Sequence, residues 1–366
     1  MEKLFGGIYK GKTVLVTGHT GFKGSWLSLW LKKMGAKVVG FSLEDPSDPC
    51  HFRLLKLEMD SMEGDIRDGA MLDAAVTRHR PDLVIHMAAQ ALVRRSYVKT
   101  LETYQTNVMG TLNLLEACRK AGTVRGVIIV TSDKVYDNQE WAWGYRETDR
   151  LGGYDPYSAS KACAEIATSS YRYAFLNLSD YGAKHRTLVA TVRAGNVVGG
   201  GDWAPDRLIP DIVRACSKRE TVVIRNPDST RHWQHVLECL SGYLVVGQKL
   251  LEGRKEAARE WNFGPTETAT LSVEQVVMQV KQYWPEFEFE VKRSDSNPHE
   301  AFALNLDSSL AHFKLGWRQV WQGARQTFIK TITWYQQYHE HGRILSETDL
   351  SDYIEEAQEA ELPWAG

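Results

Sequence analysis

Short β-branched runs alternate with longer helical patterns over the first half of the chain. The runs with the length of buried strands are Thr13 to Val16, Lys37 to Phe41, Leu83 to Met87, Val127 to Thr131 and Leu188 to Val192. The stretches with helical length and periodicity lie between them, at Gly24 to Met34, Gly69 to Arg78, Thr103 to Ala121 and Tyr157 to Leu176. This alternation is typical of βαβ units. It predicts an α/β fold with a doubly wound parallel sheet.

The alternation ends after Val192. A glycine and tryptophan loop (Gly199 to Trp203) is followed by a predicted helix from Arg207 to Lys218 and by mixed segments. We expect residues 1–193 to form the sheet domain, with a return segment at about 231–264. Residues 194–230 and 265–345 would form a smaller C-terminal substrate-binding lobe. Residues 346–366 are expected to be a solvated or loosely docked acidic tail, because Glu347 to Glu361 holds seven acids and no base.

Composition excludes several classes of protein. The 44 basic and 46 acidic residues give a formal charge of -2, which disfavours a nucleic-acid partner. The start lacks the apolar stretch of a signal peptide and no apolar run is long enough to span a membrane, so no membrane partner is expected. The five cysteines are scattered without a CxxC pair, which predicts reduced thiols in a cytoplasmic protein.

The strongest local signal follows the first predicted strand. Gly18, Gly21 and Gly24 stand in GxxGxxG spacing between that strand and an apolar helix. Gly18 would permit the tight turn, Gly21 would let the backbone approach a pyrophosphate, and Gly24 would allow close helix packing. The N–H groups at the helix start would attract the anion. The pattern predicts a Rossmann-type dinucleotide site.

The choice of dinucleotide depends on the end of the second strand. No Lys or Arg stands where a 2′-phosphate would need one, and Glu44 and Asp45 follow shortly, so NAD is favoured over NADP. Asp65, in Asp65-Ile66-Arg67, offers a carboxylate for an adenine amino group. The alternative for Asp65 is an acid at a helix N-terminus.

Candidate chemistry lies at the next strand end and the helix beyond it. Tyr157 and Lys161 stand one helical turn apart, and Ser132 ends the strand that begins at Val127. A tyrosine with a free pKa of about 10 needs a shift of roughly 3 units to act as a base near neutrality. We expect the Lys161 ammonium to supply it, with Ser132 hydrogen-bonded to the same substrate oxygen.

Together these motifs resemble the extended short-chain dehydrogenase/reductases, and within them the nucleotide-sugar 4,6-dehydratases. The resemblance covers nearly the whole chain. It is carried by residues 17–26, His86-Met87-Ala88-Ala89-Gln90, Ser132-Asp133-Lys134, Asp155-Pro156-Tyr157, residues 192–203 and Trp233-Gln234-His235-Val236. Dehydratases of dTDP and GDP sugars usually carry a glutamate in place of Lys134, and lysine there is typical of the CDP-glucose branch.

The resemblance implies the cofactor NAD, a nucleotide-sugar substrate and a set of site residues. The catalytic candidates are Ser132, Asp133, Lys134, Tyr157 and Lys161. The cofactor candidates are Gly18, Thr20, Gly21, Phe22, Lys23, Gly24, Asp65, Ile66, Ala88, Ala89, Gln90, Asn107, Tyr157 and Lys161. The substrate candidates are Gln90, Asn196, Arg207, Arg231 and His299, in which the arginines suit a diphosphate. No metal is expected, because no third ligand accompanies His232 and His235.

In this family the sugar is oxidised at C4, water is eliminated across C5 and C6, and hydride returns to C6. Asp133 would protonate the departing 6-hydroxyl, which requires a protonated carboxyl, while the ammonium of Lys134 would favour the ionised form. Lys134 as the C5 base would have to be neutral. The alternative is a strand-end ion pair without proton transfer.

The sequence is compatible with two other functions. One is a dehydratase or 4-epimerase of another nucleotide sugar, and an epimerase would not need Asp133 and Lys134. The other is an NAD sensor without catalysis, which the intact Ser132, Tyr157 and Lys161 disfavour.

A homodimer or homotetramer is also expected. Its seam would be formed by the helices Thr103 to Ala121 and Tyr157 to Leu176 through Leu112, Leu115, Ile166 and Tyr173. Alternatively, these side chains face only the sheet.

Overall fold

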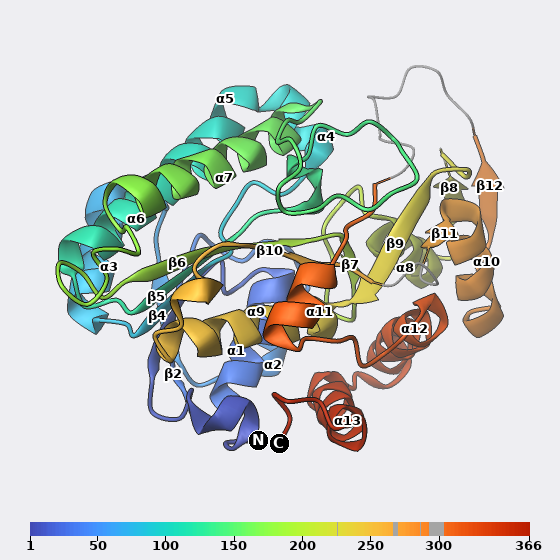
Figure 1. The fold of residues 1–366 in the computed structure, drawn as a ribbon. Helices are drawn as coiled ribbons and strands as arrows, with labels where there is room; N and C mark the ends of the chain where they lie inside the picture. Colours follow the sequence, from blue (N-terminus) through green and yellow to red (C-terminus); the bar gives the residue numbers. More distant parts are fainter. Residues whose placement is uncertain (225, 266–269, 286, 293–303) are drawn as a thin grey trace.

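A seven-stranded parallel sheet forms the centre of the computed structural model, which describes residues 1–224, 226–265, 270–285, 287–292 and 304–366 (Figure 1). Its strand order is β10-β6-β5-β4-β1-β2-β3. The strands are β1 (Thr13–Thr17), β2 (Lys37–Ser42), β3 (Asp60–Glu63), β4 (Leu83–His86), β5 (Gly126–Val130), β6 (Leu188–Ala194) and β10 (Glu260–Phe263). The order reverses beside β1, and ligands of such sheets bind at the carboxyl ends of the strands near this reversal. The predicted fold class is confirmed.

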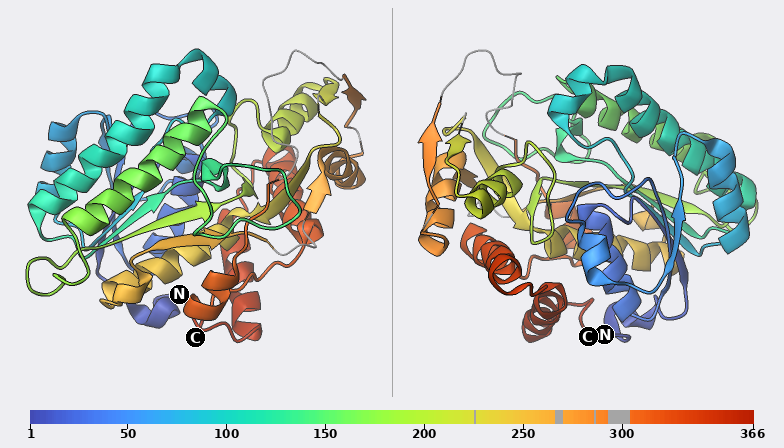
Figure 2. Two further views of the ribbon diagram at one scale, coloured as in Figure 1. Left: turned by 45° about the horizontal axis from the view of Figure 1, so that its top comes forward. Right: turned by 180° about the vertical axis from the view of Figure 1, so that it is seen from behind.

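Helices cover both faces of the sheet (Figure 2). One layer contains α1 (Phe22–Lys33) and α9 (Val236–Leu251), and the other contains α3 (Gly69–His79), α6 (Gly110–Ala121) and α7 (Pro156–Ala174). Successive strand side chains enter opposite layers: Val14 and Val16 pack in one core cluster and Leu15 in the other. Burial on both faces explains why the strands are continuous apolar runs in the sequence.

The predicted helix from Thr103 to Ala121 is not continuous. It consists of α5 (Thr100–Tyr104), the π-helical turn η2 (Gln105–Met109) and α6. The turn carries Asn107, whose side chain donates to the Gln90 carbonyl at 3.0 Å and to Ser160 Oγ at 2.8 Å. Wide turns of this kind are frequent at functional sites. This one joins the outer helices to the strand-end loop after β4.

The smaller lobe contains two short sheets. One joins β7 (Asn196–Val198), β9 (Thr230–His235) and β11 (Thr270–Ser272), and the other joins β8 (Val222–Ile224) and β12 (Phe289–Val291). Its helices are α8 (Leu208–Lys218), α10 (Val273–Tyr283) and α12 (Ala324–His341). The chain returns to the central sheet through α9 and β10. The predicted return segment therefore starts too early, because β9 pairs with β7 and β11 in the smaller lobe.

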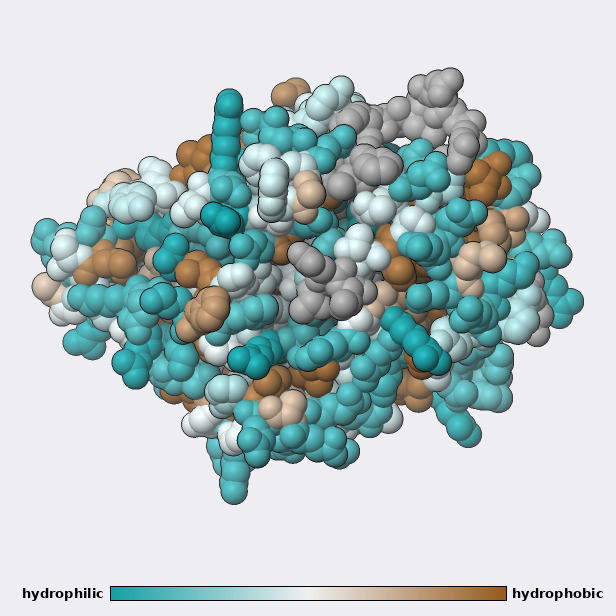
Figure 3. All heavy atoms as spheres, turned by 45° about the vertical axis from the view of Figure 1, so that its right-hand side comes forward, coloured by the Kyte–Doolittle hydropathy of each residue, from teal (hydrophilic) through white to brown (hydrophobic). Residues whose placement is uncertain are grey.

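The remaining elements are short. They are η1 (Leu4–Gly7), α2 (His51–Leu55), α4 (Val93–Val98), η3 (Asp133–Val135), η4 (Lys255–Ala257) and α11 (Ser309–Leu315). Polar side chains cover most of the face that includes the smaller lobe, and apolar atoms lie there in separate small patches (Figure 3). No helix in the described ranges is both long and apolar enough to cross a membrane.

The acidic C-terminal segment is not a loosely docked tail. Ser346–Glu359 forms helix α13, which packs against α1 and ends near the N-terminus (Figure 1). Leu350, Tyr353, Ile354 and Ala357 recur at helical spacing and are buried. Most of the acids lie on the outer face, so the charge run marks one side of an amphipathic helix.

The residues proposed for a subunit seam fall into two groups. Leu115 is fully buried in the core beneath α6, so the prediction that it forms a seam is wrong. Leu112 is half-buried, whereas Ile166 and Tyr173 on α7 are 58% and 72% exposed. The outer surface of α7 is therefore apolar in part.

Candidate active site

The glycines of the first βα turn form a tight cradle at the start of α1. Gly18 has φ +72°, and a Cβ there would lie 2.7 Å from the Ala88 nitrogen. A Cβ on Gly24 would lie 2.1 Å from the Gly18 carbonyl oxygen. Gly21 precedes the first turn of α1. Only glycine allows this close packing, and the cradle has the form that a dinucleotide pyrophosphate requires.

A cavity of about 480 Å³ opens above this cradle. Most of the predicted cofactor residues line it: Gly18, Thr20, Gly21, Phe22, Lys23, Gly24, Asp65, Ile66, Ala88, Ala89, Gln90, Tyr157 and Lys161. Asn107 is buried outside the cavity wall and accepts from the Gln90 backbone N–H at 2.8 Å. It therefore supports the wall. Arg67 also lines the cavity, with its guanidinium bound to Asp65.

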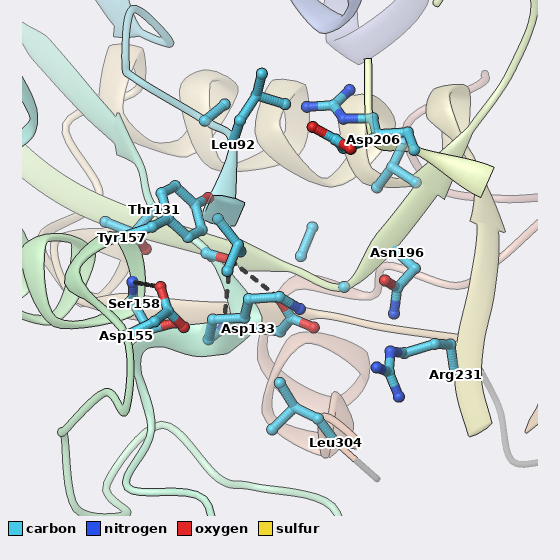
Figure 4. Close-up of a pocket in the computed structure, with 18 of the residues that line it drawn as sticks. Leu92, Thr131, Asp133, Asp155, Tyr157, Ser158, Asn196, Asp206, Arg231 and Leu304 are labelled. Atoms are coloured by element: carbon cyan, nitrogen blue, oxygen red, sulfur yellow. Dashed lines mark hydrogen bonds and ion pairs between the residues drawn. The ribbon is translucent and has the colours of Figure 1, made fainter. Parts of the chain in front are cut away.

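The catalytic candidates lie between this cavity and a second one of about 960 Å³. Tyr157 lines both cavities, and Ser132, Asp133 and Lys134 line the larger one (Figure 4). Ser132 Oγ donates to Asp133 Oδ1 at 2.9 Å, and Lys134 Nζ lies 3.8 Å from the same oxygen. Asp133 is 4% exposed, and its Oδ2 has no hydrogen-bond partner among the described residues. One carboxyl oxygen is therefore buried beside the cavity wall without a compensating hydrogen bond.

Burial sets the protonation of Tyr157 and Lys161. It raises the pKa of Tyr157 to about 12, while the hydrogen bond with Ser132 lowers that pKa by less. It lowers the pKa of Lys161 to about 8, and the nearby charge of Lys23 acts in the same direction. Lys161 Nζ donates to the Val130 carbonyl at 3.0 Å. In the chain alone burial outweighs any charge that lowers the pKa of Tyr157, so Tyr157 needs a further positive charge nearby to act as a base.

Behind the catalytic candidates lies a buried ion pair that the sequence did not reveal. Arg193 on β6 donates from Nε and Nη2 to the two oxygens of Glu165 on α7, both at 2.9 Å. Glu165 also accepts from the Thr131 hydroxyl, and Arg193 Nη1 donates to the Tyr136 hydroxyl at 2.7 Å. The pair thus connects the helix of Tyr157 and Lys161 to the strand end that carries Ser132.

The larger cavity contains the substrate candidates Asn196, Arg207 and Arg231. Asn196 and Arg231 lie across the cavity from Tyr157 (Figure 4). Asn196 Nδ2 is buried without a hydrogen-bond partner within the described part of the chain. Arg207 Nη1 donates to Asp202 Oδ2 at 2.7 Å. These groups are of the kind that bind hydroxyl and phosphate oxygens.

Two substrate candidates have a different position. The Gln90 side chain donates to Thr103 Oγ1 at 3.0 Å and accepts from the Leu92 N–H at 2.7 Å, so its polar atoms hold the loop. His299 lies outside the described residues. Sequence reasoning missed Arg94, which lines the larger cavity from α4. Its position in Val-Arg-Arg-Ser, just after a strand-end loop, is the sequence feature that could have identified it as a cavity residue.

Within the described residues, no group of three or more His, Cys, Asp or Glu side chains could hold a metal ion. His232 Nε2 is 2.6 Å from Thr270 Oγ1, and His235 Nδ1 accepts from the Leu237 N–H. Both histidines therefore have structural partners.

Comparison with known families and proteins gives consistent relatives. Residues 15–326 match the family model described as GDP-mannose 4,6 dehydratase. A CDP-glucose 4,6-dehydratase of Salmonella typhimurium is 48% identical over 350 residues, which cover 94% of this chain and 97% of that protein. A dTDP-glucose 4,6-dehydratase of Xanthomonas campestris is 28% identical, with 88% of this chain and 93% of that protein covered.

Solved structures share the fold. A dTDP-glucose 4,6-dehydratase from Streptomyces venezuelae, solved with NAD bound, has a TM-score of 0.76 and 22% identity, covering 90% of this chain and 98% of its own. A UDP-glucose 4-epimerase from Thermotoga maritima also has a TM-score of 0.76, with 21% identity and 89% and 99% coverage. Dehydratases and epimerases therefore share this architecture, and the fold alone does not separate the two reactions.

Proposed function

Because the chain belongs to the GDP-mannose 4,6 dehydratase family, within the extended short-chain dehydrogenase/reductases, we propose that it is an NAD-dependent dehydratase that converts CDP-glucose to CDP-4-keto-6-deoxyglucose. It is a hydro-lyase, since water is removed and no net oxidation takes place. The 48% identity to the Salmonella enzyme over nearly both chains supports this substrate.

One observation carries the choice of dehydration over epimerisation. Asp133 is buried beside Tyr157 and Lys134, and its Oδ2 has no partner among the described residues. A 4-epimerase needs only the group that takes and returns the proton of the 4-hydroxyl. An elimination also needs an acid for the departing 6-hydroxyl and a base for the C5 proton. Asp133 would supply the acid and Lys134 the base.

The glycine cradle and the smaller cavity fit NAD. Gly18, Gly21 and Gly24 would hold its pyrophosphate at the start of α1, and Lys161 would hold the nicotinamide ribose. When bound, NAD takes hydride from C4 of the sugar and returns it to C6. Its positively charged oxidised ring would supply the further charge that Tyr157 requires to act as a base.

The side chains then act in order. Tyr157 takes the proton of the sugar 4-hydroxyl, with Ser132 hydrogen-bonded to the same oxygen. The 4-keto group acidifies the C5 proton, which Lys134 removes. Asp133 protonates the 6-oxygen, so that water leaves and a C5–C6 double bond forms. Once hydride is added at C6, the protonated Lys134 would deliver a proton to C5, which restores both the 4-keto sugar and the neutral amine.

Substrate binding falls to the larger cavity. We assign Arg207 and Arg231 to the diphosphate, because guanidinium groups bind phosphate oxygens in bidentate fashion. Asn196, which lines this cavity, would bind a sugar hydroxyl through its amide group.

A panel of nucleotide glucoses tests the proposal. With saturating NAD we expect CDP-glucose to give a product that absorbs after alkali treatment, as 4-keto-6-deoxy sugars do, without net NADH. Tyr157→Phe serves as the matched inactive protein. Turnover of only UDP-, dTDP- or GDP-glucose would show that the proposed substrate is wrong. Formation of CDP-galactose would show that the reaction is an epimerisation and not a dehydration.

Two further proposals concern the oligomeric state and the cellular compartment. Ile166 and Tyr173, exposed on α7, would meet a second subunit in a homodimer, which could pair further into a tetramer. The five cysteines, which form no disulfide bonds in the described residues, suit the reducing cytoplasm.

A further inference from the structure

The charge of the larger cavity is poorly matched to a nucleotide diphosphate. Its described lining contains five basic and six acidic side chains. The bases are Lys23, Arg94, Lys134, Arg207 and Arg231, and the acids are Asp133, Asp137, Glu140, Asp155, Asp202 and Asp206. A sugar diphosphate brings about two negative charges. Because acids and bases are nearly balanced, a base that binds the diphosphate must give up an acidic neighbour or hold the anion beside a negative charge.

Several of the acids have structural tasks. Asp155 caps α7 by accepting from the Ser158 N–H at 3.0 Å. Asp202 accepts from Arg207 at 2.7 Å and from the Ala204 N–H at 3.0 Å. Asp133 accepts from Ser132. If one of these carboxylates moved away to make room for the substrate anion, the helix cap, the turn or the catalytic arrangement that it supports would be lost.

Asp206 has a looser position. Its Oδ1 lies 3.7 Å from Arg94 Nη1, which is beyond hydrogen-bond distance. The two side chains are 40% and 28% exposed. Asp206 has φ +61° in the loop before α8, a conformation that costs most residues energy but that Asp and Asn tolerate. The pair joins α4 of the sheet domain to the smaller lobe.

We propose that Arg94 binds the substrate diphosphate together with Arg207 and Arg231. In the absence of substrate, the Asp206 carboxylate pairs with the Arg94 guanidinium. This inference deepens the proposed function and rests on it. A phosphate oxygen would replace the distant carboxylate with a closer, charge-assisted hydrogen bond. Asp206 lies on the same side of the cavity as Leu92 of the α4 loop, and Arg231 lies on the other side (Figure 4). Arg94 and Arg231 would then hold the diphosphate from two sides.

A binding cycle tests the exchange. Affinities for CDP and for cytidine are measured by calorimetry with saturating NAD for wild type, Arg94→Gln, Asp206→Asn and the double variant. We expect Arg94→Gln to weaken CDP by roughly 10- to 100-fold and to leave cytidine within about two-fold. Asp206→Asn should tighten CDP by roughly 3- to 10-fold, and this gain should vanish in the double variant. Asn preserves the left-handed backbone.

Controls separate this exchange from other effects. Lys184→Gln removes a positive charge that is paired with Asp180 on an exposed loop away from both cavities, and it should leave CDP binding unchanged. Arg94→Lys should recover only part of the lost affinity, because an ammonium cannot bind two oxygens in a fork.

The outcomes are decisive for each claim. CDP binding within two-fold of wild type in Arg94→Gln overturns the role of Arg94. If Asp206→Asn raises the affinity for CDP equally with and without Arg94, the exchange is overturned. Asp206 would then act only by repelling the bound diphosphate. If wild type binds UDP, dTDP or GDP in place of CDP, the proposed substrate is wrong, and the same cycle with that diphosphate still tests Arg94. A wild type that binds no nucleoside diphosphate overturns both.

Discussion

Replacing Arg193 with methionine should destabilise the protein strongly at neutral pH. The change removes the two hydrogen bonds to Glu165, both at 2.9 Å, and the one to Tyr136 at 2.7 Å. Glu165 is 4% exposed and, among the described residues, would keep hydrogen bonds from the Thr131 and Thr191 hydroxyls alone. Removing one member of a buried ion pair typically costs about 3–5 kcal/mol, because the remaining charge is left unpaired in a medium of low polarity.

Equilibrium unfolding in urea, followed by circular dichroism, measures this cost. The double variant Glu165→Gln/Arg193→Met should be more stable than Arg193→Met alone, because it removes the stranded charge. Arg207→Met is a matched comparison, since its partner Asp202 keeps backbone contacts and lies at a solvent-accessible cavity. A cost below about 1 kcal/mol for Arg193→Met would refute the reasoning.

The loss of unfolding free energy in Arg193→Met should also depend on pH. Burial raises the pKa of Glu165, but the charge and hydrogen bonds of Arg193 outweigh it, so the pKa lies below its usual value in the wild type. A lowered pKa gives stability that is present above the unfolded pKa of about 4.3 and lost as pH falls further. In Arg193→Met burial dominates and raises the pKa, so this contribution changes sign. The difference between the proteins should be largest near pH 7 and shrink toward pH 4.

Four further substitutions test the site and the assembly. Tyr157→Phe should bind NAD normally and lose at least about 100-fold in turnover, and near-normal turnover would dismiss Tyr157 as the acid–base group. Asp133→Asn should still oxidise C4 and then stall, so that reduced cofactor accumulates in a single turnover; dehydration at the wild-type rate would leave Asp133 as an ion-pair residue only. Gly24→Ala should abolish NAD binding in a fluorescence titration, because its Cβ would lie 2.1 Å from the Gly18 oxygen, and unchanged affinity would contradict the cradle. Ile166→Asp should convert a dimer to a monomer by light scattering; a wild-type monomer would end the dimer proposal.

The sheet and the cofactor cradle could be predicted because their signals are local. Strands buried on both faces must be continuous apolar runs, and the glycines must stand where a Cβ would collide with backbone. The catalytic candidates could be found from the sequence equally well, since Tyr157 and Lys161 share a helix face and Ser132 ends a strand. The structure brings all three together at the junction of the two cavities.

Long-range pairs could not be predicted in this way. Arg94 and Asp206 are far apart in sequence, and neither position has a periodic or motif signal that points to the other. The same holds for Glu165 and Arg193, whose pairing depends on how α7 packs on β6. The acidic C-terminal segment differs from its prediction for another reason. A run of charge predicts a solvated tail, whereas the helical spacing of Leu350, Tyr353 and Ala357 provides the apolar face that packs against the core.

The most direct test of the central claim follows the C4 hydrogen of the sugar. CDP-glucose carrying deuterium at C4 is incubated with the enzyme and NAD, and the product is analysed by nuclear magnetic resonance. The account predicts CDP-4-keto-6-deoxyglucose with the deuterium at C6, a solvent-derived hydrogen at C5 and no net reduced cofactor. Deuterium that remains at C4 of a galactose epimer, or that leaves with released reduced cofactor, would contradict it.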